Sequence, residues 1–172
     1  MDNKGFKILI PEYKIQRKTW EIAHKISEKH RGQTPPVMIC VLNGGFMFFT
    51  ELVKSMDIDV EIDFVRVKSY DASTNTFDKT SIVKDVELDL HGKTVYIVDD
   101  ILETGSTMKE LLIHINQKSP AEINTVTLLK RKQCNHPLDY FGFELEDKSW
   151  VYGYGLDNKG IMRNYRNIYI YE

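Results

Sequence analysis

Two adjacent carboxylates, Asp99 and Asp100, separate an apolar run from a polar one in the segment TVYIVDDILETGSTM, residues 94–108. The apolar run predicts a buried strand at 95–98, and we expect both carboxylates where this strand ends and a helix is about to begin. Neighbouring strand residues point to opposite faces, so one carboxylate can reach the hydroxyls of a ligand while the other faces a metal ion or a backbone donor. The pair therefore indicates a binding site for a ligand that carries hydroxyl groups.

The next segment, ETGST, combines Gly105 with hydroxyl side chains just ahead of a predicted helix at 107–117. The glycine permits a turn that a side chain would obstruct. Thr104, Ser106 and Thr107 offer hydroxyls beside unpaired backbone N–H groups, and the helix dipole favours a phosphate there. Helix capping alone would also explain these residue types, since Asp, Ser and Thr are common N-caps. Carboxylates and loop in one run are more specific, and together they suit a sugar phosphate with its diol at the carboxylates.

A second candidate anion-binding loop, Asn43-Gly44-Gly45, follows a continuous apolar run at 37–42. The backbone N–H groups of this loop precede a helical pattern with five apolar residues on one side: Phe46, Phe49, Leu52, Val53 and Met56. A glycine turn between a strand and a helix is the simpler interpretation. The Asp99–Thr107 motif elsewhere in the chain favours anion binding here too.

Apolar strand patterns and amphipathic helix patterns alternate along the chain. The expected elements are a helix at 14–30, strands at 37–42, 58–67, 95–98 and 124–129, and helices from about 46 and at 107–117. This alternation predicts an α/β domain with a mainly parallel central sheet flanked by helices, whose ligands bind beyond the carboxyl ends of the strands. Residues 69–81 are polar and aperiodic, and we expect a functional loop that is mobile until a ligand binds.

The composition fits one soluble globular domain. The 172 residues include 23 basic and 25 acidic side chains, a net charge of -2, which gives no support for a nucleic-acid or membrane partner. The N-terminal segment MDNKGFKILIPEYK is not a signal peptide, and no run approaches the ~18 apolar residues of a membrane span. Cys40 in an apolar run and Cys134 in a polar loop suit reduced thiols, so we expect a cytoplasmic protein.

The segment VYIVDDILETGSTM resembles the signature of the type I phosphoribosyltransferases, which bind 5-phosphoribosyl-1-pyrophosphate (PRPP). Three further segments resemble motifs of the hypoxanthine/guanine members of that family. They are VLNGGFMFFTEL (41–52) for the pyrophosphate loop, VKSYD (67–71) for the closing lid and WVYGYGLDNKGIMRN (150–164) for the purine-binding hood. The four motifs occur in the family's order and cover nearly the whole chain.

The resemblance implies the type I phosphoribosyltransferase fold as a single domain over residues 1–172. A small hood would be formed by about 1–13 and 140–172, the two ends of the chain. In this hood, Trp150 would stack on the purine and Val151 would offer main-chain contacts. A core position is the usual fate of a tryptophan, so this role rests on the resemblance.

For PRPP, the resemblance implies that Asp99 and Asp100 bind the ribose and Mg²⁺, and that the loop 103–107 holds the 5′-phosphate. Ser69 and Tyr70 would close over the pyrophosphate and exclude water. Taken by themselves, these last two are ordinary polar loop residues.

Further roles follow for the hood and for the acidic residue that opens the phosphate loop. Asp157 would help to bind the purine and hold a second Mg²⁺ through water, and Arg163 would meet the pyrophosphate. Glu103 would take the proton from purine N7 as N9 attacks C1 of the ribose; a simple helix-dipole role is the alternative. A cation after VTLL would donate to the 6-oxo group of the purine, and both Lys130 and Arg131 are candidates.

Three positions depart from the family pattern. The chain has Asn43 where Lys is common, an Asp-Asp pair at Asp99 where Glu-Asp is common, and Glu103 where Asp is usual. Each keeps hydrogen-bonding capacity. The first removes a positive charge near the pyrophosphate, so the backbone donors of Gly44 and Gly45 would matter more.

The implied activity is a Mg²⁺-dependent transfer of the phosphoribosyl group from PRPP to N9 of hypoxanthine or guanine, giving IMP or GMP and pyrophosphate in purine salvage. The family is usually dimeric or tetrameric, so we expect a homo-oligomer. One alternative is a xanthine-preferring enzyme; the cations of LLKRK disfavour adenine, and the hood disfavours orotate. Another is a regulatory nucleic-acid-binding homologue that senses PRPP, but the basic residues are dispersed along the chain.

Overall fold

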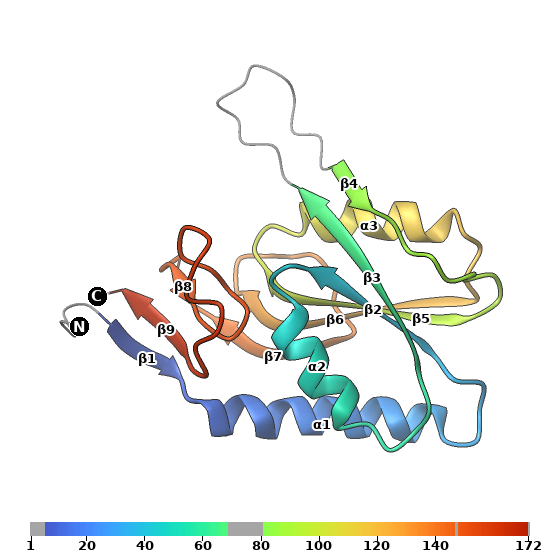
Figure 1. Ribbon diagram of the computed structural model, residues 1–172, viewed down its shortest axis with the longest axis horizontal. Helices are drawn as coiled ribbons and strands as arrows, with labels where there is room; N and C mark the ends of the chain where they lie inside the picture. Colours follow the sequence, from blue (N-terminus) through green and yellow to red (C-terminus); the bar gives the residue numbers. More distant parts are fainter. Residues whose placement is uncertain (1–5, 69–80, 147, 172) are drawn as a thin grey trace.

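The computed structural model describes residues 6–68, 81–146 and 148–171 (Figure 1). Ser69 and Tyr70, with nearly all of the loop expected to close over a ligand, lie outside the described residues. The elements in chain order are β1 (Phe6–Ile10), α1 (Glu12–His30), β2 (Val37–Leu42), α2 (Phe46–Lys54), β3 (Glu61–Lys68), β4 (Ser81–Lys84), β5 (Thr94–Leu102), α3 (Ser106–Asn116), β6 (Glu122–Arg131), β7 (Tyr140–Leu145), β8 (Val151–Tyr152) and β9 (Ile168–Tyr171).

Six of these strands form the main sheet, in the order β4-β3-β2-β5-β6-β7. All neighbouring pairs are parallel except β3 and β4. Helices α1 and α2 lie on one side of the sheet and α3 on the other (Figure 1). The predicted α/β fold with a mainly parallel central sheet is therefore confirmed.

Strand β2 is apolar throughout because both of its faces are covered. Met38 and Cys40 belong to the core cluster that includes α1 and α2, whereas Val37, Ile39 and Val41 pack with α3. A strand with one solvated face would alternate apolar and polar residues, but a strand covered by helices on both sides must be apolar at every position. This covered strand leads directly into the loop of residues 43–45.

Helix α1 confirms the predicted amphipathic pattern. Ile15, Ile22 and Ile26 are buried against the sheet, whereas Tyr13 and Trp20 are exposed. At 19 residues it is longer than α2 and α3. None of the helices in the described ranges is long and apolar enough to cross a membrane.

Strand β5 extends further than expected, so Asp99 and Asp100 lie within the strand and not at its end. Its ladder with β6 continues to Leu102, which pairs with Lys130. The expected strand end was wrong because β6 is long enough to keep pairing with β5 past the carboxylates. The polar character of the pair therefore reflects what it faces, and not the end of the sheet.

The core-facing side of α2 and the start of β3 differ in part from expectation. Helix α2 begins at Phe46 as expected, and Phe49 and Leu52 are buried as predicted, but Phe46 itself is exposed and Phe48 is buried in its place. Met56 lies beyond the end of this helix. Strand β3 starts at Glu61, later than predicted, but its buried and exposed residues alternate as expected.

The small sheet β1-β9-β8 forms a hood from both ends of the chain, beside the main sheet (Figure 1). Aromatic rings hold it together. The ring of Tyr152 stacks on that of Tyr169 with their centres 5.7 Å apart, and it packs edge to face with Phe6 with their centres 5.8 Å apart. The hood does not begin at residue 140 as expected, because β7 pairs with β6 in the main sheet. Gly142 permits this close pairing, since a Cβ there would lie 2.6 Å from the carbonyl oxygen of Leu128.

Candidate active site

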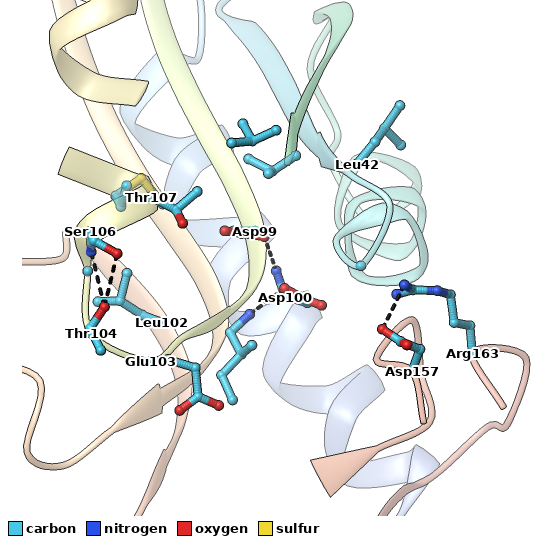
Figure 2. Close-up of a pocket in the computed structure, with 16 residues that line it drawn as sticks. Leu42, Asp99, Asp100, Leu102, Glu103, Thr104, Ser106, Thr107, Asp157 and Arg163 are labelled. Carbon is cyan, nitrogen blue, oxygen red and sulfur yellow. Dashed lines mark hydrogen bonds and ion pairs between the residues drawn. The ribbon is translucent and has the colours of Figure 1, made fainter. Parts of the chain in front are cut away.

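A cavity of about 480 Å³ lies at the carboxyl ends of β2 and β5, the sheet edge where the sequence predicts ligand binding (Figure 2). Residues 99–108 supply much of its lining, and Gly44 contributes from the loop after β2. Asp157 and Arg163 complete it from the hood segment. The structure thus brings together the predicted carboxylates, the phosphate loop and part of the hood.

Each of the two carboxylates accepts a hydrogen bond from the backbone N–H of the residue that follows it in β5. The N–H of Asp100 donates to Asp99 Oδ1 at 2.9 Å, and the N–H of Ile101 donates to Asp100 Oδ1 at 2.8 Å (Figure 2). Burial, reinforced by the charge of Asp100, raises the pKa of Asp99 well above its usual range. Burial also raises the pKa of Asp100. A buried carboxylate beside a half-buried one is an arrangement that a bound cation would stabilise.

The loop after β2 approaches Asp100 so closely that Gly44 has no room for a side chain. A Cβ at Gly44 would overlap Asp100 Oδ2. The N–H of Gly45 donates to Val41 O at 3.1 Å, and Asn43 is exposed outside the cavity lining. Of the three loop residues expected to face the pyrophosphate, the structure places Gly44 in the cavity and gives the Gly45 N–H a different partner, because the turn into α2 uses it.

The phosphate loop depends on Gly105, which has a left-handed φ of +87° at the N-cap of α3. A Cβ at this position would also lie only 2.7 Å from His136 Cβ. Thr104 Oγ1 and Ser106 Oγ lie 3.1 Å apart, and the helical ladder starts where the N–H of Lys109 donates to Gly105 O at 2.9 Å. The Ser106 N–H lies 3.4 Å from Thr104 Oγ1, and the first-turn N–H groups ahead of Lys109 have no intrahelical partner, so the start of α3 can attract an anion.

Glu103 lies where two cavities meet, paired with Arg131. Arg131 Nε donates to Glu103 Oε2 at 2.9 Å, and Nη2 donates to Oε1 at 3.0 Å. Glu103 lines both the 480 Å³ cavity and a second one of about 390 Å³, and Arg131 lines the second. Lys130 lines neither; its Nζ lies 5.5 Å from the ring centre of Phe141. Of the two candidate cations, Arg131 is therefore the one at a cavity.

The second cavity has the walls expected for a flat heterocycle. Trp150, Val151 and Leu156 give it an apolar side, and Trp150 is 60% exposed, so a ligand can stack on its ring. Lys148 also lines this cavity, although nothing in the sequence pattern singled it out. The one feature of the sequence that could have indicated Lys148 is that it lies two residues before Trp150, where the hood motif begins. Ile101, which lines both cavities, was likewise missed because it looks like an ordinary strand residue.

Asp157 and Arg163 form an ion pair at the hood side of the first cavity (Figure 2). Arg163 Nη2 lies 2.7 Å from Asp157 Oδ1, and Arg163 Nη1 donates to Gly155 O at 2.6 Å. The second oxygen of Asp157 accepts the N–H of Gly160 at 2.7 Å. Gly155 must lack a side chain, because a Cβ there would overlap the carbonyl oxygen of Gly44. The hood is thus fitted closely to the loop after β2.

A mainly parallel sheet with two carboxylates on a central strand, a phosphate loop at the next helix and an aromatic cavity under a hood together define the phosphoribosyltransferase class. The family model described as "Phosphoribosyl transferase domain" matches residues 12–159. The chain is 37% identical to a hypoxanthine-guanine phosphoribosyltransferase of Aquifex aeolicus, over 98% of this chain and 96% of the relative. It therefore belongs to the phosphoribosyltransferase family, in the hypoxanthine-guanine branch.

Two further similarities agree with this placement. The chain is 35% identical to a hypoxanthine-guanine-xanthine phosphoribosyltransferase of Tritrichomonas foetus, over 92% of this chain and 87% of the relative. Its fold matches the crystal structure of a hypoxanthine phosphoribosyltransferase from Staphylococcus aureus with a TM-score of 0.90 at 30% identity, covering 99% of this chain and 93% of the other.

Proposed function

We propose that this protein transfers the 5-phosphoribosyl group from PRPP to N9 of hypoxanthine or guanine, giving IMP or GMP and pyrophosphate. The names of its relatives support this reaction. One structural observation carries it: the cavity with the carboxylates and the phosphate loop shares Glu103 with the cavity beside Trp150. A sugar phosphate in the first and a purine in the second would meet at that carboxylate.

In this proposal the start of α3 holds the 5′-phosphate. The N–H groups of its first turn and the hydroxyls of Thr104, Ser106 and Thr107 are the donors, and the helix dipole adds to their attraction. Asp99 and Asp100 take the ribose hydroxyls. Pyrophosphate leaves C1 with positive charge developing on the sugar, so nearby anionic side chains stabilise that charge as well as position the ring.

Mg²⁺ fits the carboxylate pair. Asp99 and Asp100 line one cavity, and the raised pKa of each carboxyl reflects the cost of keeping two neighbouring negative charges partly away from water there. A divalent cation would offset that cost, and one or two carboxylates with substrate phosphates are the usual ligands of Mg²⁺. When bound, the ion would neutralise charge on pyrophosphate and ribose oxygens.

Asp157, which lines both cavities, is proposed to help bind the purine and a second Mg²⁺, and Arg163 to serve the pyrophosphate side. Both oxygens of Asp157 already have protein partners, so a contact with a second Mg²⁺ through water suits it better than direct ligation. The guanidinium of Arg163 would meet the pyrophosphate, with Gly44 close by. The proposed covering roles of Ser69 and Tyr70 rest on the motif resemblance alone.

On the purine side, Trp150 would stack on the ring and the main chain of Val151 would contact its edge. Arg131 is proposed as the donor to the 6-oxo group, because it lines the cavity and Lys130 does not. Glu103 would accept the proton from N7. A homo-oligomeric state and a cytoplasmic location belong to the same proposal; two buried free cysteines support the latter.

Product formation with PRPP and Mg²⁺ tests this proposal, using adenine, guanine, hypoxanthine and xanthine in parallel. IMP and GMP are expected, with no product from adenine, since a 6-amino group would face a cation. Xanthine is included because the Tritrichomonas foetus relative carries it in its name. Product from xanthine alone would mean the xanthine-preferring alternative. PRPP binding without transfer to any purine would favour a regulatory protein.

A further inference from the structure

One buried arginine, Arg131, connects two segments that bound the purine cavity. Its side chain is 4% exposed, at the end of β6. Its Nε and Nη2 donate to the two oxygens of Glu103, and Nη2 also donates to Ser149 O at 3.0 Å. Glu103 belongs to the turn between β5 and α3, and Ser149 to the segment that enters β8. One guanidinium therefore fixes two separate parts of the chain relative to each other.

The contact with Glu103 depends on the planar fork of the guanidinium. Two parallel N–H groups meet two carboxylate oxygens, which fixes the plane of the carboxylate as well as its position. The Glu103 side chain is 53% exposed, so packing does little to hold it in one rotamer. A lysine would supply the charge, but only as a single point of attachment.

The contact with Ser149 extends this constraint to the wall of the purine cavity. Ser149 directly precedes Trp150 and Val151, and both of these line the cavity. Because the Trp150 ring is mostly exposed, the protein packs little against it. The hydrogen bond from Arg131 to the neighbouring carbonyl therefore helps to set where the ring stands relative to Glu103.

We propose that Arg131 is a positioning residue that locks the Glu103 carboxylate and the Ser149–Trp150 wall in one arrangement, so that purine N7 meets its proton acceptor. The inference rests on the proposed function, in which Glu103 takes that proton. Arg131 acts here through Glu103, in addition to any contact that it makes with the 6-oxo group. Lys132, whose Nζ lies 2.6 Å from Glu146 Oε2 in a surface ion pair next to Arg131, offers a matched control.

A double-mutant cycle separates this role from direct purine binding. Arg131→Lys is expected to lower the single-turnover rate with hypoxanthine about 10²-fold, with the KM for PRPP changed less than about twofold. In a Glu103→Gln background the same substitution should cost less than about threefold, because the positioned group is gone. Lys132→Met should have no effect in either background. An equal loss in both backgrounds would overturn the proposal.

Chemical rescue distinguishes the fork from the charge. Added ethylguanidinium should raise the turnover of Arg131→Ala at least about tenfold over its value without the additive. Ethylammonium at the same concentration should not raise it. Equal rescue by the two cations would show that charge alone suffices. The Arg131→Lys cycle does not depend on this variant, so a folding defect in Arg131→Ala leaves the proposal open to refutation.

A third readout needs no substrate. The chain has two tryptophans, so Trp20→Phe leaves Trp150 as the only one. In that background Arg131→Lys should raise acrylamide quenching of Trp150 about 1.3-fold by loosening the wall, and Lys132→Met should leave it unchanged. Unaltered quenching would refute the Ser149 part of the lock. Since this experiment requires no transfer reaction, failure of the lock and failure of the proposed function give different results.

Discussion

Alanine in place of Gly105 is expected to weaken PRPP binding by disturbing the phosphate loop in two separable ways. The first is backbone strain, because φ is +87° and a left-handed residue with a side chain costs roughly 1–2 kcal/mol. The second is space. The new Cβ would lie 2.7 Å from His136 Cβ, about 0.7 Å closer than the 3.4 Å at which ordinary van der Waals contact begins. The loop or His136 must therefore move by several tenths of an ångström.

Gly92→Ala is the matched control, because it carries the strain without the collision. Gly92 has a φ of +69°, and a Cβ there would meet nothing within 4 Å. Gly92→Ala should lose roughly 1–2 kcal/mol of unfolding free energy, and Gly105→Ala at least as much because the collision adds to the strain. Gly105→Ala alone should displace the donors at the start of α3, and a shift of that size costs about 10- to 100-fold in kcat/KM for PRPP.

The assay measures initial rates at saturating hypoxanthine with PRPP varied, beside urea unfolding of both variants. If kcat/KM for PRPP fell equally in Gly105→Ala and Gly92→Ala, the collision with His136 would have no bearing on the phosphate site. A normal value in both variants would refute the reasoning in the same way.

Three further outcomes are expected. Glu103→Gln keeps the shape of the side chain but removes the base, so single-turnover kcat should fall about 10²-fold or more with little change in stability; a helix-dipole role would instead leave turnover near normal. Asp100→Asn should weaken PRPP binding in Mg²⁺, and EDTA should weaken wild-type binding at least tenfold; equal wild-type affinity with and without the metal would exclude the magnesium site. Burial lowers the pKa of His30, whose Nε2 lies 2.8 Å from Tyr96 Oη, below the value of 6.5 expected in the unfolded chain. Protonation then favours unfolding, so stability should fall as the pH drops from about 7 to 5, and urea titrations should show a smaller fall in His30→Gln.

Much of the candidate site follows from the sequence because its residues are neighbours along the chain. The segment from Asp99 to Thr107 carries its carboxylates, its glycine turn and its hydroxyls in one run, so the connection from β5 to α3 brings them to one cavity although β5 continues past the carboxylates. The buried side of α1, with Ile15 and Ile22, likewise follows from a 3.6-residue period. Such features need only local geometry, which the residue pattern specifies.

Tertiary structure decided which side chains face each other across segments that are distant in sequence. The sequence left Lys130 and Arg131 equal, but the register of β6 turns Arg131 toward Glu103 and places Lys130 over Phe141. Successive strand residues point to opposite faces, so a shift of one residue would have exchanged the two cations.

The same holds for the contact between Gly44 and Asp100, for Lys148 at the purine cavity, and for β7, which joined the main sheet instead of the hood. Local pattern fixes the period and the turns of each element. Only the packing of all the elements together fixes their register and their neighbours, because that choice depends on the sum of contacts over the whole core.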